Sequence, residues 1–352
     1  MDKKPAPSRI GSSGAGFPSE LRFDPVSRDW VVIATGRAKR PEMFKDESRK
    51  KENAPKEDCP FCKMSKQEKP ALIISGGKKA VIGDKLPDDW SVVVIPNKYP
   101  AFCKSDSLNA RSDGPYQIMD SVGFHEVVIT RDHEKKLANL SLEQMKEVID
   151  AYQDRYLVLK KNKFVSYILI FHNSSREAGA SIAHPHSQII AIPFIDPDLH
   201  SSINGSRVYF QTHEECVHCV MLDWDRKDGR RIVFENEDFV VLIPFASRIA
   251  FETRVYPKKH QVHFEDITDN QKKFFAEALK VALEKLYKGL DDPPYNFFIH
   301  TAPCDGRDYG HYHWHLEIFP KTSTWAGFEL GAGIEISTIE PEAAAEYLRK
   351  QK

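Results

Sequence analysis

The sequence lacks an excess of charge of either sign: among its 352 residues, 50 are Lys or Arg and 51 are Asp or Glu, for a net charge of −1. Proteins dedicated to nucleic acid or to anionic membranes usually carry a basic excess, so the balance argues against both as partners. The sequence also lacks an uninterrupted apolar run of about 18 residues, which a membrane-spanning helix requires. Its N-terminal segment has no apolar core of a secretory signal, and we expect a cytoplasmic protein.

The composition also shows neither low-complexity nor collagen-like bias, since 41% of the residues are hydrophobic and 29% are charged. These values are typical of a globular protein. The length exceeds the roughly 250–300 residues at which a single hydrophobic core usually stops growing, so we expect two domains or two repeats. Residues 1–18 are rich in Pro, Gly and Ser without apolar periodicity, and we expect them to form a disordered leader.

Cysteine is scarce, but its placement is informative. Four of the six cysteines form two C-x-x-C pairs, Cys59/Cys62 and Cys216/Cys219. In a reducing compartment such pairs more often bind metal than form disulfides. Eight of the 14 histidines also lie in clusters, namely His184, His186, His260, His263, His300, His311, His313 and His315.

The chain contains one unit used twice. Five landmarks recur at an offset of 127 residues: His133 and His260, Ser141 and Thr268, His184 and His311, His186 and His313, and Pro193 and Pro320. Two unrelated domains would have no reason to share this register. Each unit combines a capping box that starts a helix with β-branched apolar runs typical of strands. We therefore predict an α+β fold with mainly antiparallel sheets and helices on one side, divided into halves at 19–195 and 196–352.

Each half carries the parts of a four-ligand metal site. Zinc prefers four tetrahedral sulfur or nitrogen ligands, and two distant histidines can complete the pair of thiolates from a C-x-x-C turn. The expected ligands are Cys59, Cys62, His133 and His184 in the first half, and Cys216, Cys219, His260 and either His311 or His313 in the second. A redox dithiol and buried small residues are the alternatives for the cysteines. Because four ligands leave no open position for substrate, we expect two structural zinc ions.

The motif H-P-H-S-Q contains a candidate nucleophile. Alternate residues of a strand share a face, so His184, His186 and Gln188 point together. A neutral imidazole at His186 can attack phosphorus while amide and hydroxyl donors stabilise the equatorial oxygens, although the residue types fit a second metal ligand about equally well. Upstream, Gly179 and Ser181 can bring backbone and hydroxyl donors close to a phosphate.

A compact basic cluster, R-A-K-R-P at 37–41, follows an apolar run near the N-terminus. The guanidinium groups of Arg37 and Arg40 suit the oxygens of a diphosphate. A solvated turn is the alternative for such a basic run.

These residues together resemble the galactose-1-phosphate uridylyltransferase family, a branch of the histidine-triad superfamily. The resemblance rests on Asp24-Pro-Val-x3-Trp30-Val, R-A-K-R-P at 37–41, C-P-F-C at 59–62, Asn97-Lys-Tyr-Pro100, Gly123-Phe-His-Glu-Val-Val128 with His133, G-x-S-x-x-H-P-H-S-Q at 179–188, and Ala326-Gly-Phe-Glu329. It implies tandem histidine-triad-like repeats with a catalytic N-terminal half, in agreement with the duplication. It also implies a homodimer whose active sites draw on both chains.

The resemblance implies a transfer in two steps. His186 would attack the α-phosphorus of a nucleoside diphosphate sugar, release hexose 1-phosphate and form a nucleotidyl-histidine, which a second phosphate acceptor would resolve with ping-pong kinetics. Ser181 and Gln188 would hold the α-phosphoryl oxygens. The other implied substrate contacts are Arg37, Arg40, Asn173 and Gly179 at the phosphates, Phe61 and Asn97 near the nucleoside, and Phe328 and Glu329 at the hexose. In one interpretation, Phe328 and Glu329 contact the hexose that is bound by a neighbouring subunit.

Histidine-triad hydrolases have a third histidine where this chain has Gln188. A histidine there can protonate a poor leaving group, whereas a sugar phosphate leaves as a stable anion and needs little acid help. The glutamine therefore favours transfer between phosphates over hydrolysis.

The second half leaves one choice of ligand open. The internal offset equates His311 with the ligand His184, whereas the Cys216/Cys219 pair resembles the two-zinc members of the family, whose pattern indicates His313 as the fourth ligand. We favour His313. We place catalysis at His186 in the first half because Asp308, which would repel a phosphate, replaces Ser181 at the internal offset.

The leading function is that of a UDP-glucose:hexose-1-phosphate (galactose-1-phosphate) uridylyltransferase. One alternative is an ADP-glucose phosphorylase, which transfers an adenylyl group to inorganic phosphate. The other is a non-catalytic, zinc-containing module that binds nucleotides. The motifs indicate the superfamily but do not identify the base.

Overall fold

The computed structural model describes residues 19–34, 40–45, 55–64, 67–80, 82 and 86–352. The expected leader at 1–18 and the basic residue Arg37 lie outside the described residues. Among the residues that are described, no helix has the length and apolar character needed to cross a membrane.

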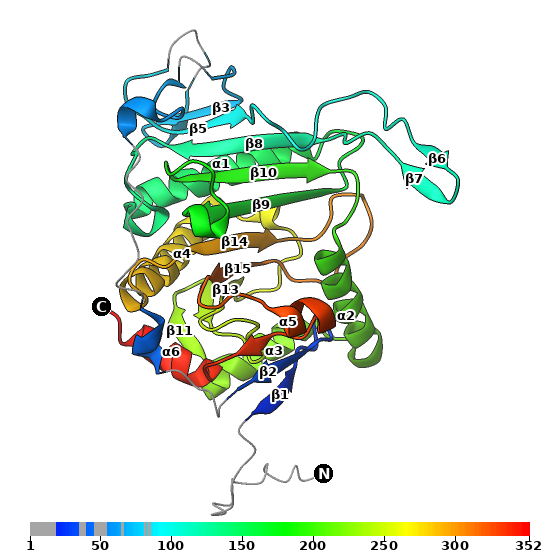
Figure 1. Cartoon of the computed structure of the whole chain (residues 1–352), viewed down its shortest axis with the longest axis vertical. Helices are drawn as coiled ribbons and strands as arrows, with labels where there is room; N and C mark the ends of the chain where they lie inside the picture. The colour runs from blue at the N-terminus through cyan, green and yellow to red at the C-terminus, as the bar shows by residue number, and fades with distance from the viewer. Residues whose placement is uncertain (1–18, 35–39, 46–54, 65–66, 81, 83–85) are drawn as a thin grey trace, which may run out of the picture.

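The centre of the fold is an antiparallel sheet of eleven strands (Figure 1). In sheet order the strands are β11 (Ile232–Glu235), β12 (Phe239–Leu242), β13 (Thr253–Pro257), β15 (His315–Pro320), β14 (Tyr295–His300), β9 (Tyr167–Ser174), β10 (His186–Ile192), β8 (Phe124–Thr130), β5 (Trp90–Pro96), β3 (Leu72–Ser75) and β4 (Lys78–Lys79). The remaining strands are β1 (Glu20–Phe23), β2 (Trp30–Ile33) and β16 (Ile336–Ser337) in a small sheet, and β6 (Arg111–Asp113) and β7 (Tyr116–Ile118) in a hairpin.

The described helices lie between and around these strands. The α-helices are α1 (Leu142–Leu159), α2 (Pro197–His213), α3 (Val217–Asp228), α4 (Asp269–Gly289), α5 (Gly327–Ala332) and α6 (Pro341–Arg349). Short 3₁₀ helices include η2 (Pro41–Phe44), η3 (Lys56–Asp58), η5 (Leu137–Asn139), η6 (Arg176–Ala178) and η7 (Phe264–Asp266). The predicted mixture of helices with large antiparallel sheets is confirmed.

The duplication is visible in the order of the strands. Along the sheet, the order β8-β10-β9 of the first half is followed by β14-β15-β13 of the second, so β8, β10 and β9 correspond to β13, β15 and β14 in reverse order. Strand β9 pairs antiparallel with β14 and joins the halves into one sheet. Both expected capping boxes are present. The Ser141 hydroxyl accepts from the Gln144 amide N–H at the start of α1, and Thr268 does the same with Gln271 at the start of α4.

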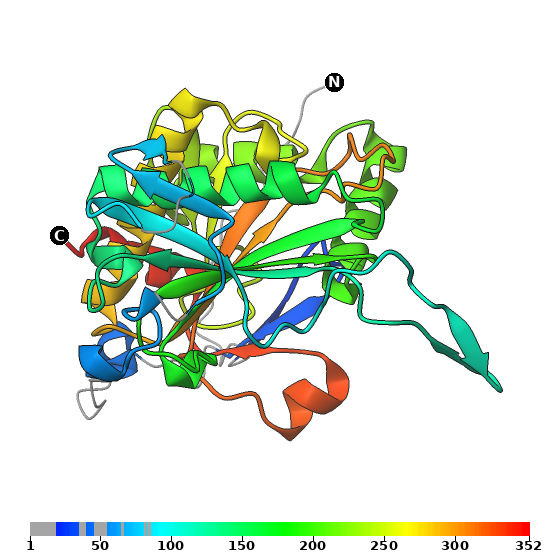
Figure 2. The same cartoon turned by 90° about the horizontal axis from the view of Figure 1, so that it is seen from above.

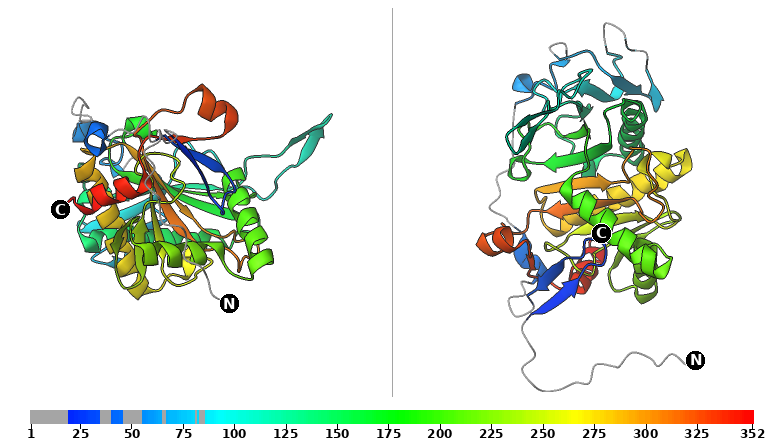
Figure 3. Two further views of the ribbon diagram at one scale, coloured as in Figure 1. Left: turned by 90° about the horizontal axis from the view of Figure 1, so that it is seen from below. Right: turned by 90° about the vertical axis from the view of Figure 1, so that its right-hand side faces the viewer.

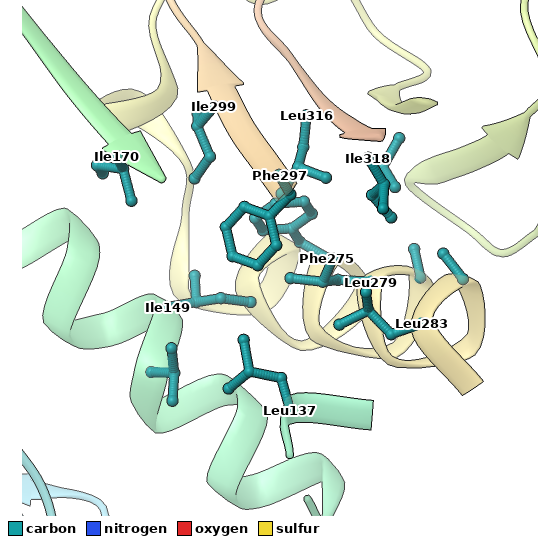
Figure 4. Close-up of a cluster of buried hydrophobic side chains, with 14 of the residues drawn as sticks. Leu137, Ile149, Ile170, Phe275, Leu279, Leu283, Phe297, Ile299, Leu316 and Ile318 are labelled. Atoms are coloured by element: carbon teal, nitrogen blue, oxygen red, sulfur yellow. The ribbon is translucent and has the colours of Figure 1, made fainter. Parts of the chain in front are cut away.

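The main hydrophobic core lies between one face of the sheet and helices α1, α4 and α6. Figure 4 shows its centre, where Ile149 of α1 and Phe275 of α4 meet Phe297 and Ile299 of β14. Side chains alternate along a strand, so Asn296 and its equivalents point to the opposite face. We call that opposite face the ligand face, because it carries the candidate catalytic residues.

Not every helix covers the core face. Leu222 of α3 packs against Val240, Leu242 and Tyr256 of strands β12 and β13. These three residues alternate with core residues, so they lie on the ligand face of the second half of the sheet. Helix α3 begins after Cys216, so this position brings the second C-x-x-C pair to the sheet. Two segments project from the body: the β6–β7 hairpin and the segment that carries α5 (Figures 2 and 3).

Candidate functional site

Four predicted metal ligands of the first half come together. Ligand atoms of Cys59, Cys62, His133 and His184 all lie within 4.8 Å of one another. The Cys62 Sγ is 3.3 Å from Nδ1 of His133, and the Cys59 Sγ is 3.5 Å from Nδ1 of His184. The Nε2 of His184 is 2.7 Å from the carbonyl oxygen of Thr130, which can only accept, so Nε2 carries the proton and Nδ1 is free to bind a cation.

The thiols of this cluster need a nearby positive charge in order to ionise. Burial, together with the neighbouring Cys59, raises the pKa of Cys62 to about 11, which disfavours a free thiolate. A bound metal ion would supply the compensating positive charge. The donor set and its spacing therefore fit a tetrahedral ion, which would connect the loop after η3 to the end of β8 and the start of β10.

The second half forms an equivalent cluster from Cys216, Cys219, His260 and His313. The Cys219 Sγ lies 3.4 Å from Nδ1 of His260 and 3.5 Å from Nδ1 of His313. The Nε2 of His313 is 3.0 Å from the carbonyl oxygen of Pro257. Within the described part of the chain, His311 is not a member of this cluster.

The two clusters reveal a change in the internal register. Pro257 is 127 residues after Thr130, so the offset holds at the ends of β8 and β13. The histidines that contact these carbonyls, His184 and His313, are 129 residues apart. The second half thus has two extra residues before β15, and the structural counterpart of His186 is His315 rather than His313.

His186 is the first residue of β10 and is only 7% exposed. Its Nδ1 is 2.8 Å from the carbonyl oxygen of His184, so Nδ1 carries the ring proton and the lone pair is on Nε2. Burial lowers the pKa of His186, which keeps the imidazole neutral. The Phe61 ring packs edge-on against it with centroids 5.1 Å apart. This arrangement presents an uncharged nitrogen nucleophile in a fixed orientation.

The strand that carries His186 is supported from its other face. Ser187 points into the core, where its hydroxyl accepts a hydrogen bond of 2.5 Å from the Tyr152 hydroxyl of α1. The Ser187 hydroxyl also lies 3.1 Å from Nδ1 of His172 on β9. These buried contacts hold β10 in a fixed position against α1 and β9, and a nucleophile on the strand requires such support.

Gln188 is held on the ligand face by a residue that the sequence analysis gave no role. Its Oε1 lies 2.7 Å from Nε2 of His125 on β8, and the amide of Asn97 lies 3.0 Å from the same ring nitrogen. The only signal for His125 in the sequence was its place in the motif G-F-H-E-V-V. The structure thus brings Asn97 and Gln188 to one histidine.

The turn before β10 carries the expected phosphate-binding residues. Gly179 adopts a φ of +94°, a left-handed conformation that glycine tolerates best. Asn173 lies at the end of β9, and its Oδ1 accepts a hydrogen bond of 2.8 Å from Asn296 of β14. Asn296 also donates to the carbonyl oxygen of Ala178 at 2.7 Å. A residue of the second half that the sequence analysis missed therefore fixes Asn173, while Ser181 remains exposed nearby.

The equivalent position in the second half is blocked. His315 Nε2 lies 3.3 Å from a carboxylate oxygen of Glu317, which occupies the place of Gln188. Arg254 and Arg248 pair with Glu317 and keep it charged. Burial lowers the pKa of His315 to about 4. A carboxylate at this point repels a phosphate, so the structure offers no second nucleophilic site there.

Three expected substrate residues lie on elements other than those that carry His186, Gln188 and Asn173. Arg40 is exposed at the start of η2. Phe328 and Glu329 lie on α5, in the projecting segment beside the second half of the sheet (Figure 1). The structure does not bring Phe328 or Glu329 to His186 within one chain.

A cavity of about 920 Å³ lies on the ligand face of the second half. Its lining includes Asn296, Phe298, His300 and Glu317 from the sheet and Trp325 from the segment that carries α5. The cavity therefore extends from the contact with Asn173 to the base of α5.

Comparison with known proteins agrees with this arrangement. A family model described as galactose-1-phosphate uridyl transferase, N-terminal domain, matches residues 16–196, and a domain of unknown function, DUF4921, matches residues 120–351. ADP-glucose phosphorylase of Arabidopsis thaliana is 34% identical over 97% of this chain and 95% of its own length. Galactose-1-phosphate uridylyltransferase of Thermotoga maritima is 32% identical over 94% of this chain and 98% of its own length.

Solved structures show the same relationship. A crystal structure of an ADP-glucose phosphorylase from Arabidopsis thaliana with bound ADP-glucose superposes with a TM-score of 0.77 at 29% identity, covering 95% of this chain and 99% of that one. A uridylyltransferase structure superposes with a TM-score of 0.71 at 27% identity, covering 94% and 97%. Relatives over nearly the full length are thus nucleotidyltransferases and phosphorylases, and the resemblance inferred from the motifs is confirmed. The chain belongs to the galactose-1-phosphate uridylyltransferase family.

Proposed function

We propose that the protein transfers the nucleotidyl group of a nucleoside diphosphate sugar to a phosphate acceptor through a nucleotidyl-histidine at His186. The observation that carries this proposal is the hydrogen bond between Nδ1 of His186 and the carbonyl oxygen of His184. It places the ring proton on Nδ1 and leaves the Nε2 lone pair available for attack.

The two steps balance without a proton donor. Nε2 of His186 forms a bond to the α-phosphorus, the bond from that phosphorus to the bridging oxygen breaks, and hexose 1-phosphate leaves with the electron pair. A phosphate oxygen of the acceptor then forms a bond to the same phosphorus, the bond from that phosphorus to Nε2 breaks, and the electron pair returns to Nε2 to restore the neutral imidazole. Ser181 and Gln188 would donate hydrogen bonds to the equatorial oxygens as their charge grows. The oxygen of hexose 1-phosphate leaves as a stable anion, which suits an amide at position 188.

The remaining substrate contacts are those that the family resemblance implies. Asn173 and the backbone at Gly179 would hold the phosphates, together with Arg37 and Arg40. The nucleoside would lie against Phe61, which packs on His186, and Asn97, which lies beside His125.

Two zinc ions would serve as structural supports. The clusters at Cys59 and Cys216 each offer two sulfur and two imidazole donors, the set that zinc prefers. The first would fix His184 two residues before the nucleophile. The two halves, 19–195 and 196–352, would each carry one ion, and only the first would be catalytic.

The first candidate reaction is that of a UDP-glucose:hexose-1-phosphate uridylyltransferase. The second is that of an ADP-glucose phosphorylase, which the similarity to the Arabidopsis thaliana enzyme favours. Both reactions use the same attack by His186 and differ in the base of the donor and in the acceptor.

Labelling with two donors distinguishes the candidates. The protein is incubated with UDP-glucose or ADP-glucose that carries ³²P at the α-phosphate, and the protein-bound label and released glucose 1-phosphate are measured. We expect acid-labile, base-stable label from at least one donor, because a phosphorus–nitrogen bond has this stability. The donor that labels faster identifies the base. Absence of both label and glucose 1-phosphate with either donor would contradict the proposal and favour the nucleotide-binding module.

We also propose that the protein is a homodimer in which the α5 segment of one chain completes the His186 site of the other. Phe328 is 52% exposed and Leu330 is 73% exposed on a segment that projects from the body (Figure 2). Exposed apolar side chains on a projecting segment are typical of an interface. This arrangement would bring Phe328 of the partner subunit to the hexose.

Mixing two inactive variants tests the dimer. His186→Gln removes the nucleophile and Glu329→Gln changes the expected hexose contact. If the site is shared, random mixed dimers regain one intact site each, and activity returns to about a quarter of the wild-type value. No recovery after verified subunit exchange, or a monomer in solution, would contradict a shared site.

A further inference from the structure

His125 occupies a position between two expected substrate contacts. It lies on β8, half-buried on the ligand face, next to β10. One ring nitrogen faces Gln188 and Asn97, and the other faces the backbone of Ala101. A single ring therefore contacts the strand of the nucleophile and the turn after β5.

The backbone contact determines where the ring carries its proton. The amide N–H of Ala101 donates to Nδ1 of His125 over 3.2 Å, and a backbone N–H can only donate. Nδ1 therefore holds a lone pair, and in the neutral ring the proton is on Nε2. Burial lowers the pKa of His125, which keeps the ring neutral.

The position of this proton fixes the Gln188 amide. Nε2 of His125 is 2.7 Å from Oε1 of Gln188, so the ring N–H donates to the glutamine oxygen. The reversed amide would place its NH₂ group against this N–H, with two donors facing one another. Gln188 must therefore turn its NH₂ group away from His125.

We propose that His125 is a positioning residue that holds the Gln188 amide with its NH₂ group toward the α-phosphoryl oxygens, an inference that rests on the proposed function. A free glutamine presents oxygen and nitrogen with equal ease, and its oxygen would repel the growing negative charge. A fixed amide needs no reorganisation during the transfer, so the benefit appears in the rate of the chemical step.

Asn97 lies beside the same ring nitrogen. Its Oδ1 accepts from the Tyr99 amide N–H over 2.9 Å, which turns its NH₂ group toward Nε2 of His125. Since Nε2 already donates to Gln188, it does not accept from Asn97. The Tyr99 amide N–H, and not His125, therefore sets the orientation of the Asn97 amide.

Two substitutions of His125 separate positioning from structural support. His125→Gln can place an N–H donor near the position of Nε2, whereas His125→Asn can accept from Ala101 but is too short to reach Gln188. We expect His125→Asn to slow single-turnover labelling of the protein about tenfold or more, with the KM for the donor sugar within about twofold of wild type. His125→Gln should stay within about threefold of the wild-type rate.

A double-mutant cycle with Gln188→Ala provides the specific readout. If His125 acts through Gln188, His125→Asn should slow labelling no further in the Gln188→Ala background. Multiplying effects would overturn the proposal, as would a wild-type rate in His125→Asn or an equal loss in His125→Gln. Absence of labelling in the wild-type protein would instead reject the proposed function, so the two failures are distinguishable.

Discussion

Replacing His186 with glutamine is expected to abolish nucleotidyl transfer, lowering kcat by about 10⁴-fold or more. Glutamine is a polar side chain of similar reach, but the lone pair of its amide nitrogen is delocalised into the carbonyl group and is not available for attack on phosphorus. His186 is buried, and the His184 carbonyl oxygen holds its Nδ1. Steady-state release of glucose 1-phosphate from the preferred donor measures the loss.

The matched control is the same substitution at His315. This histidine has the corresponding place on β15, and its Nδ1 contacts the His313 carbonyl oxygen at 3.1 Å. Glu317 blocks its other nitrogen, so His315→Gln is expected to retain transfer. Transfer that survives in His186→Gln but is lost in a folded His315→Gln would move the reaction to the second half.

Removing one ligand of the first metal cluster is expected to have the second largest effect. Cys59→Ser should lower the zinc content from about two to about one per chain, since a structural site depends on its complete ligand set. It should also lower the Tm by roughly 10 °C, because a loss of several kcal/mol shifts Tm by about 2–4 °C per kcal/mol in domains of this size. Transfer should fall with it, because His184 belongs to the cluster and its carbonyl oxygen holds Nδ1 of His186.

Cys103→Ser is the control for this experiment. Cys103 is exposed and belongs to neither cluster, so its substitution should leave zinc content, Tm and activity unchanged. Elemental analysis of protein purified without chelator gives the metal count. A count near zero in the wild-type protein, or an unchanged count in Cys59→Ser, would contradict the ligand assignment.

The sequence predicted the features that depend on local pattern. The capping boxes at Ser141 and Thr268 are decided by residues three positions apart, and both form as expected. The alternation in H-P-H-S-Q correctly placed His186 and Gln188 on one face of a strand, because side-chain direction in a strand has a period of two. His184, which was expected to share that strand, lies in a bend before it.

Because of the same period of two, the sequence pattern did not reveal the change in register between the two halves. A shift of two residues keeps every side chain on its original face, so His311-x-His313-x-His315 fits either alignment. Only the contact of His313 with the Pro257 carbonyl reveals which histidine corresponds to His184. An offset counted along the sequence could not show where the two additional residues lie.

Contacts between distant segments were also beyond the sequence. His125 reaches Gln188 because β8 pairs with β10, and Asn296 reaches Asn173 because β14 pairs with β9. The residues of each pair are 63 and 123 positions apart in the chain. Neither contact is predicted by a local motif, because each depends on which strands pair in the sheet.

The proposed nucleotidyl-histidine is tested most directly by locating the nucleotide on the protein. The enzyme is mixed with the preferred donor in a single turnover, quenched in base and digested, and the peptide that contains residues 184–188 is sequenced by mass spectrometry. We predict the added mass of one nucleotidyl group, a nucleoside monophosphate less water, on His186, and this mass disappears when the phosphate acceptor is supplied. Glucose 1-phosphate formed with no nucleotide on the protein, or a nucleotide attached to another residue, would contradict this prediction.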